Sequence, residues 1–132
     1  MIEFFMPMEK VPRTTHQQKQ VAVKNGKPVF YEPPDLADAR AKLMAHLGQH
    51  VPEEKITKGI RLTVRWLFKK TKGHYNGEYK LTKPDLDNSN KLLQDCMSRL
   101  GFWKDDNLVA SLLAEKFWAD IPGIYIRIEV LE

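Results

Sequence analysis

The sequence contains very little cysteine and no long hydrophobic run. Its one cysteine, Cys96, excludes an intramolecular disulfide and cannot form a cysteine-based zinc cluster. No apolar run approaches the roughly 20 residues that a membrane-spanning helix needs. The first residues include an acid, Glu3, and no basic leader, which argues against a signal peptide. We therefore expect a protein without a membrane segment that works in the reducing cytoplasm.

Several common catalytic signatures are also missing from the sequence. There is no Walker phosphate-binding loop, no dinucleotide-binding glycine pattern and no Ser-His-Asp or Cys-His set. Among the histidines only His46 and His50 have the spacing of metal ligands on one helix face. They lack the intervening acid of a zinc protease, and Gly48 and Pro52 weaken a helix there.

Composition fits one globular domain over residues 1–132, with 42% hydrophobic and 29% charged residues. The net charge of +4 is unevenly distributed. Residues 1–84 carry 16 Lys and Arg against 8 Asp and Glu, whereas residues 85–132 carry 5 against 9. This asymmetry suggests a polyanionic partner beside a carboxylate-rich site. Charges scattered over a solvated surface explain it equally well.

The hydrophobic pattern predicts a small α+β domain. Apolar runs and alternation predict strands at residues 2–6, 21–23, 28–31, 60–68, 108–118 (a strand or strand pair) and 124–130. Helical spacing predicts helices at 35–47 and 85–100, a polar loop is expected at 13–20, and Asn25-Gly26 predicts a hairpin turn. Segment 69–83 predicts a mobile basic loop or loose hairpin over the active face. The order of elements favours a small mixed β-sheet flanked by two main helices.

Four acids stand out at two turns of the chain: Asp85 and Asp87 ahead of the second helix, and Asp105 and Asp106 after it. The first pair has a purely structural explanation. Asp85 is an N-cap that accepts from free backbone N–H groups, Asp87 favours the helix dipole, and Asp87 with Lys91 is an ordinary i, i+4 ion pair.

The alternative is a carboxylate site for a divalent cation. A helix over 85–100 spans about 24 Å, so Asp106 meets Asp85 and Asp87 only if the following strand runs back along the helix. Converging carboxylates repel one another, and a cation with hard oxygen ligands, Mg²⁺ or Mn²⁺, removes that repulsion. Phosphodiester hydrolysis fits such a site, with Lys91 adding positive charge where the phosphorus centre becomes more negative.

Lysines ahead of the acids form the basic side of the sequence. The candidate DNA contacts are Lys69, Lys70, Lys72, Lys80 and Lys83. Tyr75 and Tyr79 lie among them as candidate stacking partners. Lysine–phosphate contacts give affinity without reading sequence. A solvated loop without a ligand is the alternative.

A longer motif combines these acids with their surroundings. It consists of residues 83–88 (KPDLDN), Lys91, Asp95, residues 101–106 (GFWKDD), Val109, Glu115 and Lys116. This pattern resembles the RusA family of Holliday-junction resolvases, strongly over about residues 80–130 and more weakly in the opening strand and in 60–68. The sequence departs from the family in the polar pair Ser89-Asn90 and in the length of segment 69–83.

The resemblance implies a small homodimeric, Mg²⁺-dependent endonuclease, often encoded by phages and prophages, that nicks opposed strands of four-way DNA junctions. The family's three metal-binding aspartates match Asp85, Asp87 and Asp106, its catalytic lysine matches Lys91, and Asp105 is an assisting residue. A two-fold dimer suits a junction because it presents two equal sites. We expect its interface to use apolar residues left over on the sheet or on a helix.

Two other functions remain open at this point. The chain could be a non-catalytic junction- or DNA-binding module that keeps the fold, although acids facing phosphates would weaken a pure binder. It could also be a nuclease of the same chemistry that selects flaps or other branched DNA.

Overall fold

The computed structural model describes residues 1–14, 20–24 and 26–131. The elements in chain order are β1 (Ile2–Pro7), β2 (Gln20–Lys24), β3 (Lys27–Tyr31), α1 (Pro34–Leu47), β4 (Ile60–Lys69), α2 (Leu86–Leu100), the short 3₁₀ helix η2 (Asp106–Leu108), β5 (Val109–Ala119) and β6 (Gly123–Val130).

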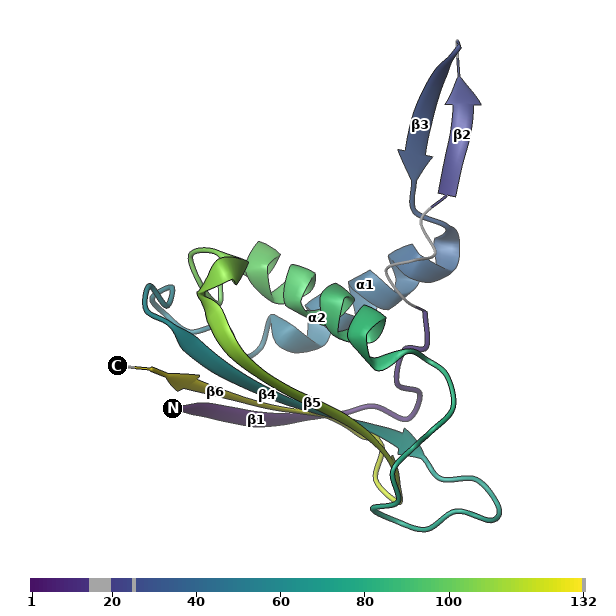
Figure 1. Cartoon of the computed structure of the whole chain (residues 1–132), viewed down its shortest axis with the longest axis vertical. Helices are drawn as coiled ribbons and strands as arrows, with labels where there is room; N and C mark the ends of the chain where they lie inside the picture. Colours follow the sequence, from purple (N-terminus) through teal and green to yellow (C-terminus); the bar gives the residue numbers. More distant parts are fainter. Residues whose placement is uncertain (15–19, 25, 132) are drawn as a thin grey trace.

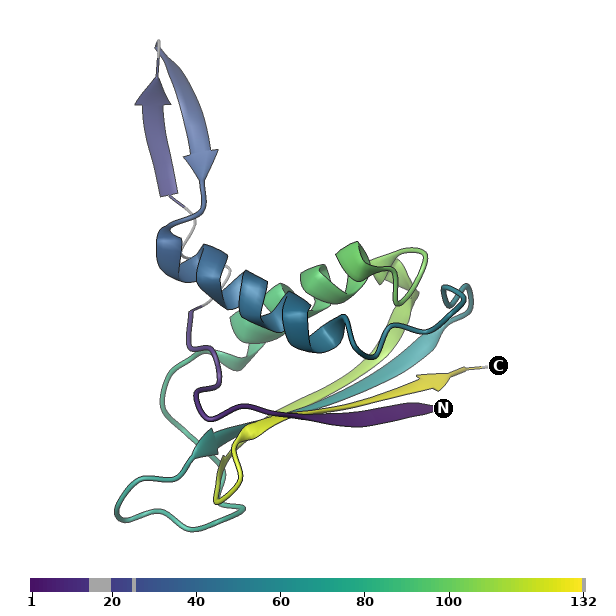
Figure 2. The same cartoon turned by 180° about the vertical axis from the view of Figure 1, so that it is seen from behind.

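The main sheet has four strands in the order β1-β6-β4-β5. Strands β4 and β5 are parallel, whereas β6 runs antiparallel to both β4 and β1. Both helices lie on the same face of this sheet, as the two opposite views in Figures 1 and 2 show. The predicted α+β fold, a small mixed sheet with two main helices, is confirmed.

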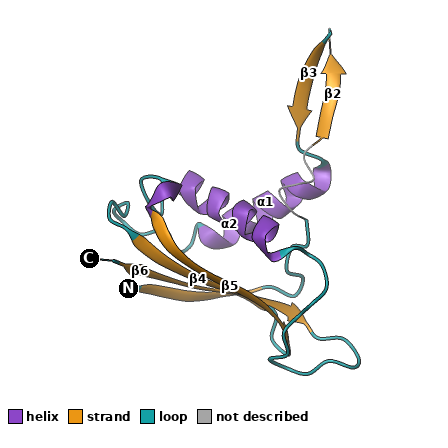
Figure 3. Ribbon diagram, viewed as in Figure 1, coloured by secondary structure: helices purple, strands orange, loops and turns teal. Residues whose placement is uncertain are grey.

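Strands β2 and β3 form a separate hairpin that projects beyond the start of α1 (Figures 1 and 3). Lys24 pairs with Lys27, and Gly26 has a φ of 75°, a conformation that glycine adopts without steric penalty. The predicted hairpin is confirmed. Asn25 of its turn, and residues 15–19 of the loop predicted at 13–20, lie outside the described residues.

The helices and the last strands agree with the sequence pattern. Helix α2 ends at Gly101, whose φ of 88° is the left-handed C-cap conformation, and the Gly101 N–H donates to the Ser98 carbonyl. The chain then passes through η2 into β5, which is one continuous strand rather than a strand pair.

The core lies between the helices and the sheet. Alternate residues of β4 face the helices and are at most 3% exposed: Ile60, Leu62, Val64, Trp66 and Phe68. Helix α2 contributes Leu93, Cys96 and Met97, each 0% exposed. Burying each large apolar side chain stabilises the fold by about 1.5–3 kcal/mol, so this layer fixes α2 over the sheet. Among the described residues, no helix is long and apolar enough to cross a membrane.

The predicted loop or loose hairpin at 69–83 is found as a loop over residues 70–83, with two differences from the prediction. Lys69 is the last residue of β4, and the following segment is bonded to the outer edge of β5. The Trp118 N–H donates to the Glu78 carbonyl at 2.8 Å, and the Lys80 N–H donates to the Lys116 carbonyl at 3.0 Å. Because β5 is the last strand of the sheet, this pairing covers part of an otherwise open edge.

Candidate active-site groove

A groove of about 720 Å³ separates the first half of α2 from β5. We call it the acid groove, and its lining residues are Asp85, Leu86, Asp87, Asn90, Lys91, Gln94, Leu112, Ala114 and Lys116. Figure 1 shows α2 lying alongside β5 where the groove forms. The structure thus brings three of the predicted site residues, Asp85, Asp87 and Lys91, to one concave surface.

The start of α2 leaves both acids of the groove available. Asp85 occupies the N-cap position with extended backbone, but its carboxylate accepts no capping hydrogen bond. The predicted capping bond is therefore wrong, although the helix does begin directly after Asp85. Asp87 lies in the first turn, and both side chains are exposed.

Lys91 is exposed and lies in the second turn of α2. The ion pairs within the described part of the chain include none between Lys91 and Asp87, so the structural alternative for this lysine is not formed. Its positive charge faces the groove without a fixed partner.

Asp106 lies at a second hollow that adjoins the acid groove. This hollow, of about 250 Å³, is lined by Lys91, Gln94, Asp95 and Asp106. Lys91 and Gln94 border both spaces, so the chain does run back along α2 as convergence requires. The two acid-bearing turns therefore lie on the same side of the molecule, with Lys91 between them.

In the described part of the chain, the carboxylates do not form a compact cluster of metal ligands. Over residues 1–14, 20–24 and 26–131, no three His, Cys, Asp or Glu side chains lie close enough to hold a metal ion together. The donor chemistry nevertheless fits a hard cation, because Asp85, Asp87 and Asp106 offer exposed carboxylate oxygens. These oxygens lie around one groove and its side hollow.

Asp105 and Asp106 have opposite electrostatic environments although they are neighbours. The Asp105 carboxylate accepts a hydrogen bond from the Asn107 N–H at 3.0 Å, which lowers the pKa of Asp105. The adjacent Asp105 carboxyl raises the pKa of Asp106. Asp105 thus acts as the N-cap of η2 and biases Asp106 toward keeping its proton.

The polar run after Asp87 is buried, and Asn90 of this run lines the acid groove. Asn88, Ser89 and Asn90 are all at most 3% exposed. Asn90 accepts a hydrogen bond from the Trp66 indole N–H at 3.2 Å and donates to Gln94 at 3.0 Å. The departure at Ser89-Asn90 therefore fills buried positions, of which Asn90 joins α2 to Trp66 of β4.

None of the five predicted DNA-contacting lysines lines the acid groove. Lys69, Lys70, Lys72 and Lys83 are exposed, and none of them is among the lining residues of the acid groove. Lys80 is only 2% exposed, and its ammonium donates to the Thr82 hydroxyl and the Lys83 carbonyl. The predicted phosphate contact is wrong for Lys80, because its charge is enclosed by protein.

Sequence reasoning assigned no role in the site to three polar residues that line the groove: Asn90, Gln94 and Lys116. Their spacing contained a usable signal. Asn90 and Gln94 follow Asp87 at helical intervals, and Lys116 alternates with Leu112 and Ala114 on one side of β5.

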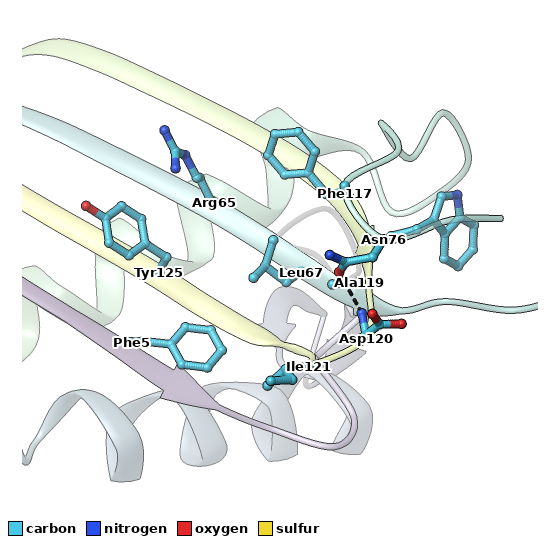
Figure 4. A pocket seen from close by; sticks show the side chains of 11 residues that line it. Phe5, Arg65, Leu67, Asn76, Phe117, Ala119, Asp120, Ile121 and Tyr125 are labelled. Carbon is cyan, nitrogen blue, oxygen red and sulfur yellow. Dashed lines mark hydrogen bonds between the residues drawn. The ribbon is translucent and has the colours of Figure 1, made fainter.

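Another hollow, of about 590 Å³, lies on the sheet face away from the helices (Figure 4). Its apolar side chains include Phe5, Leu67, Phe117, Ile121 and Tyr125. We call this surface the open face. It contains none of the predicted catalytic residues.

Carboxylates beside an unpaired lysine in an open groove are typical of enzymes that act on phosphate esters. Comparison with known families agrees with this class: the pattern of the family described as Endodeoxyribonuclease RusA matches residues 7–129. The chain belongs to this family and is an endodeoxyribonuclease, which confirms the resemblance.

Two relatives cover most of the chain. It is 33% identical over 116 residues to the "Crossover junction endodeoxyribonuclease rusA" of Lactococcus phage r1t, with 86% of each chain covered. It is 27% identical over 118 residues to the "Uncharacterized protein YqaN" of Bacillus subtilis (strain 168), with 81% of this chain and 82% of the relative covered.

Proposed function

We propose that the chain resolves four-way DNA junctions by hydrolysing phosphodiester bonds in opposed strands, in a reaction that depends on a divalent cation. The observation that carries this proposal is the placement of Asp85, Asp87 and Lys91 on one groove, with Asp106 at the adjoining hollow. The name of the phage relative, a crossover junction endodeoxyribonuclease, supports the branched substrate.

We assign Asp85, Asp87 and Asp106 as ligands of Mg²⁺, with Mn²⁺ as the alternative ion. Carboxylate oxygens are the donors that both ions prefer. When bound, such an ion supplies an activated water and neutralises charge on the phosphate. A cation also relieves the repulsion among three exposed carboxylates.

Lys91 and the exposed lysines have separate tasks in this proposal. Lys91 places a positive charge next to the phosphate oxygens, where negative charge increases in the transition state. Lys69, Lys70, Lys72 and Lys83 contact backbone phosphates away from the reacting centre and give affinity without sequence preference.

The active form that we propose is a homodimer. A four-way junction offers two equivalent scissile phosphates, and one chain carries one acid groove. A second copy would provide the second groove. We place that copy on the open face, because the helices leave this face uncovered. Its apolar side chains suit an interface between identical chains.

The direct test is nicking of a synthetic four-way junction with Mg²⁺, with Mn²⁺ and with EDTA. The wild type is expected to nick opposed strands only with a metal ion. Asp85→Asn, Asp87→Asn and Asp106→Asn should abolish nicking and still bind the junction, while Glu54→Gln, at an exposed acid away from the groove, should nick normally.

The same assay separates the alternatives. A wild-type protein that binds the junction but never nicks it would be a non-catalytic DNA-binding module. Equal cutting of flaps and four-way junctions at the same salt concentration would indicate a broader branch-selective nuclease, since salt alone changes affinity strongly.

A further inference from the structure

Two lysine ammonium groups hold the short main-chain segment that leads into Asp85. The Lys116 ammonium donates to the Thr82 carbonyl at 2.5 Å and to the Pro84 carbonyl at 2.8 Å. The Lys80 ammonium donates to the Lys83 carbonyl at 2.7 Å and to the Thr82 hydroxyl. Every carbonyl of residues 82–84 thus accepts a hydrogen bond from a charged side chain.

The two lysines come from one structural unit. Lys116 belongs to β5, and Lys80 belongs to the segment that pairs with the edge of β5. Lys80 is enclosed, with its ammonium 4.3 Å from the centre of the Trp118 ring. Burial lowers the pKa of Lys80, because enclosing its charged ammonium costs free energy. An exposed lysine on a surface loop would not carry this cost.

The segment that they hold leads directly into the start of α2. Asp85 makes no side-chain capping bond, so the helix start depends on main-chain contacts. Lys116 also lines the acid groove beside Asp85 and Asp87. The Lys116 ammonium therefore lies at the groove and contacts the main chain that immediately precedes Asp85.

We propose that Lys116, with Lys80 behind it, is a positioning residue of the nuclease site: by binding the carbonyls of residues 82–84, it fixes how Asp85 and Asp87 enter the groove. The inference rests on the proposed function, because it assigns a role toward those two acids. It predicts that loss of Lys116 loosens the metal site and slows the reaction without weakening DNA binding.

A phosphate contact is the competing role for a groove lysine, and it has a different kinetic signature. A lysine that binds the DNA backbone contributes to the stability of the enzyme–substrate complex, so its removal raises KM. A lysine that orients ligands acts on the metal affinity and on kcat, and loss of such supporting contacts typically costs 10–100-fold.

The experiment compares Lys116→Met, Lys116→Arg and Lys80→Met with the wild type, using Mn²⁺ alone as the calorimetric probe and junction nicking for kcat and KM. Lys116→Met should lower Mn²⁺ affinity and kcat by about 10-fold or more, with KM within about twofold. Lys116→Arg keeps the charge and several donors and should recover part of both losses. Lys80→Met should change the same two quantities in the same direction.

The matched control is Lys58→Met, which removes an exposed lysine outside the groove and should leave Mn²⁺ affinity, kcat and KM unchanged. Thermal unfolding of each variant confirms that it is folded. If Lys116→Met does not fold, Lys116→Gln replaces it, because the glutamine side-chain amide keeps a hydrogen-bond donor. The same measurements are made, and the same direction of change is expected.

Unchanged Mn²⁺ affinity and kcat in Lys116→Met would overturn the inference, and so would a rise in KM alone. An equal loss in Lys58→Met would also overturn it, since general charge would then be the cause. In all these cases an active wild type leaves the proposed function intact. A wild type that neither binds Mn²⁺ nor nicks the junction would instead remove the proposed function and this inference together.

Discussion

At the scale of single residues, Lys91 is the charge that borders both parts of the site. It lines the acid groove with Asp85 and Asp87, and the adjoining hollow with Asp106. A lysine paired with Asp87 would be a surface ion pair worth at most about 1 kcal/mol to stability. Since that pair is not formed, the role of Lys91 has to be sought in its effect on the substrate.

Replacing Lys91 by Met should lower kcat by about 100-fold or more, because one preorganised positive donor at the phosphate is removed. Affinity for the junction and the thermal midpoint should change little, since the side chain is exposed. Steady-state nicking, a gel-shift titration and thermal unfolding measure the three quantities. A normal kcat together with a lower unfolding midpoint would restore the ion-pair explanation.

The acid limb of the pH profile should depend on Asp105. Asp106 has to be ionised to bind a cation, and its raised pKa means that it holds its proton to a higher pH than an ordinary aspartate. Activity is therefore lost as the pH falls through that raised value. Asp105→Asn removes the neighbouring carboxyl but keeps an oxygen for the Asn107 N–H, so the limb should move to lower pH.

Nicking rates at saturating Mg²⁺, measured from acid to neutral pH, test this shift. Asp105→Glu serves as the control, because it keeps a carboxyl next to Asp106. A limb that stays in place, or moves upward, in Asp105→Asn would show that Asp106 does not govern the acid side.

Residue types and spacing predicted the acids and Lys91 as site residues, but not the structural surroundings of these side chains. An aspartate followed by another two residues later is visible in any sequence. Whether a lysine points to solvent depends on contacts made by distant strands. Lys80 was assigned to DNA because it follows a basic run, yet it is enclosed through the pairing of its segment with β5.

At the scale of elements, a buried polar contact joins α2 to the sheet in addition to the apolar core. The Trp66 indole N–H donates to the Asn90 side chain, and both residues are at most 2% exposed. Asn90→Ala leaves that N–H unpaired in the core, which should reduce the free energy of unfolding by about 1–3 kcal/mol. Urea denaturation followed by fluorescence measures the loss.

Trp66→Phe is the matched variant, because it removes the donor and keeps an aromatic ring. In the double variant the loss should be smaller than the sum of the two single losses, since neither partner is left unpaired. Strictly additive losses would mean that this hydrogen bond does not couple α2 to β4.

Regular elements were predictable because their own periodicity specifies them. The alternation in β4 and the apolar stripe of α2 are properties of short segments, and the structure follows both. The parallel pairing of β4 with β5, and the pairing of residues 77–80 along β5, join segments with no shared local pattern. Asp106 lies near Lys91 as a consequence of that long-range arrangement. From the sequence alone, this convergence could be stated only as a requirement for a shared site.

At the scale of the whole molecule, the two faces of the sheet differ in what covers them. One face is covered by α1 and α2 and carries the acid groove at its β5 side, whereas the open face carries apolar side chains among charged ones. The charges there are already paired within the chain, for example Arg65 with Glu115 and Arg61 with Glu129. A partner on this face would therefore meet apolar side chains beside charges that already have partners, which favours association through it.

If the open face joins two copies, light scattering at micromolar concentration should give twice the chain mass of 15.4 kDa. Leu113 is 50% exposed and alternates onto the open face with Phe117. Leu113→Arg places a like charge from each copy into the interface and should give a monomer that nicks one junction strand per encounter, because each chain keeps one intact acid groove. Leu81→Arg changes an even more exposed leucine, at 89%, that does not line the open-face hollow, and it should remain dimeric. A monomeric wild type would contradict the homodimer, and a dimeric Leu113→Arg would place the interface elsewhere.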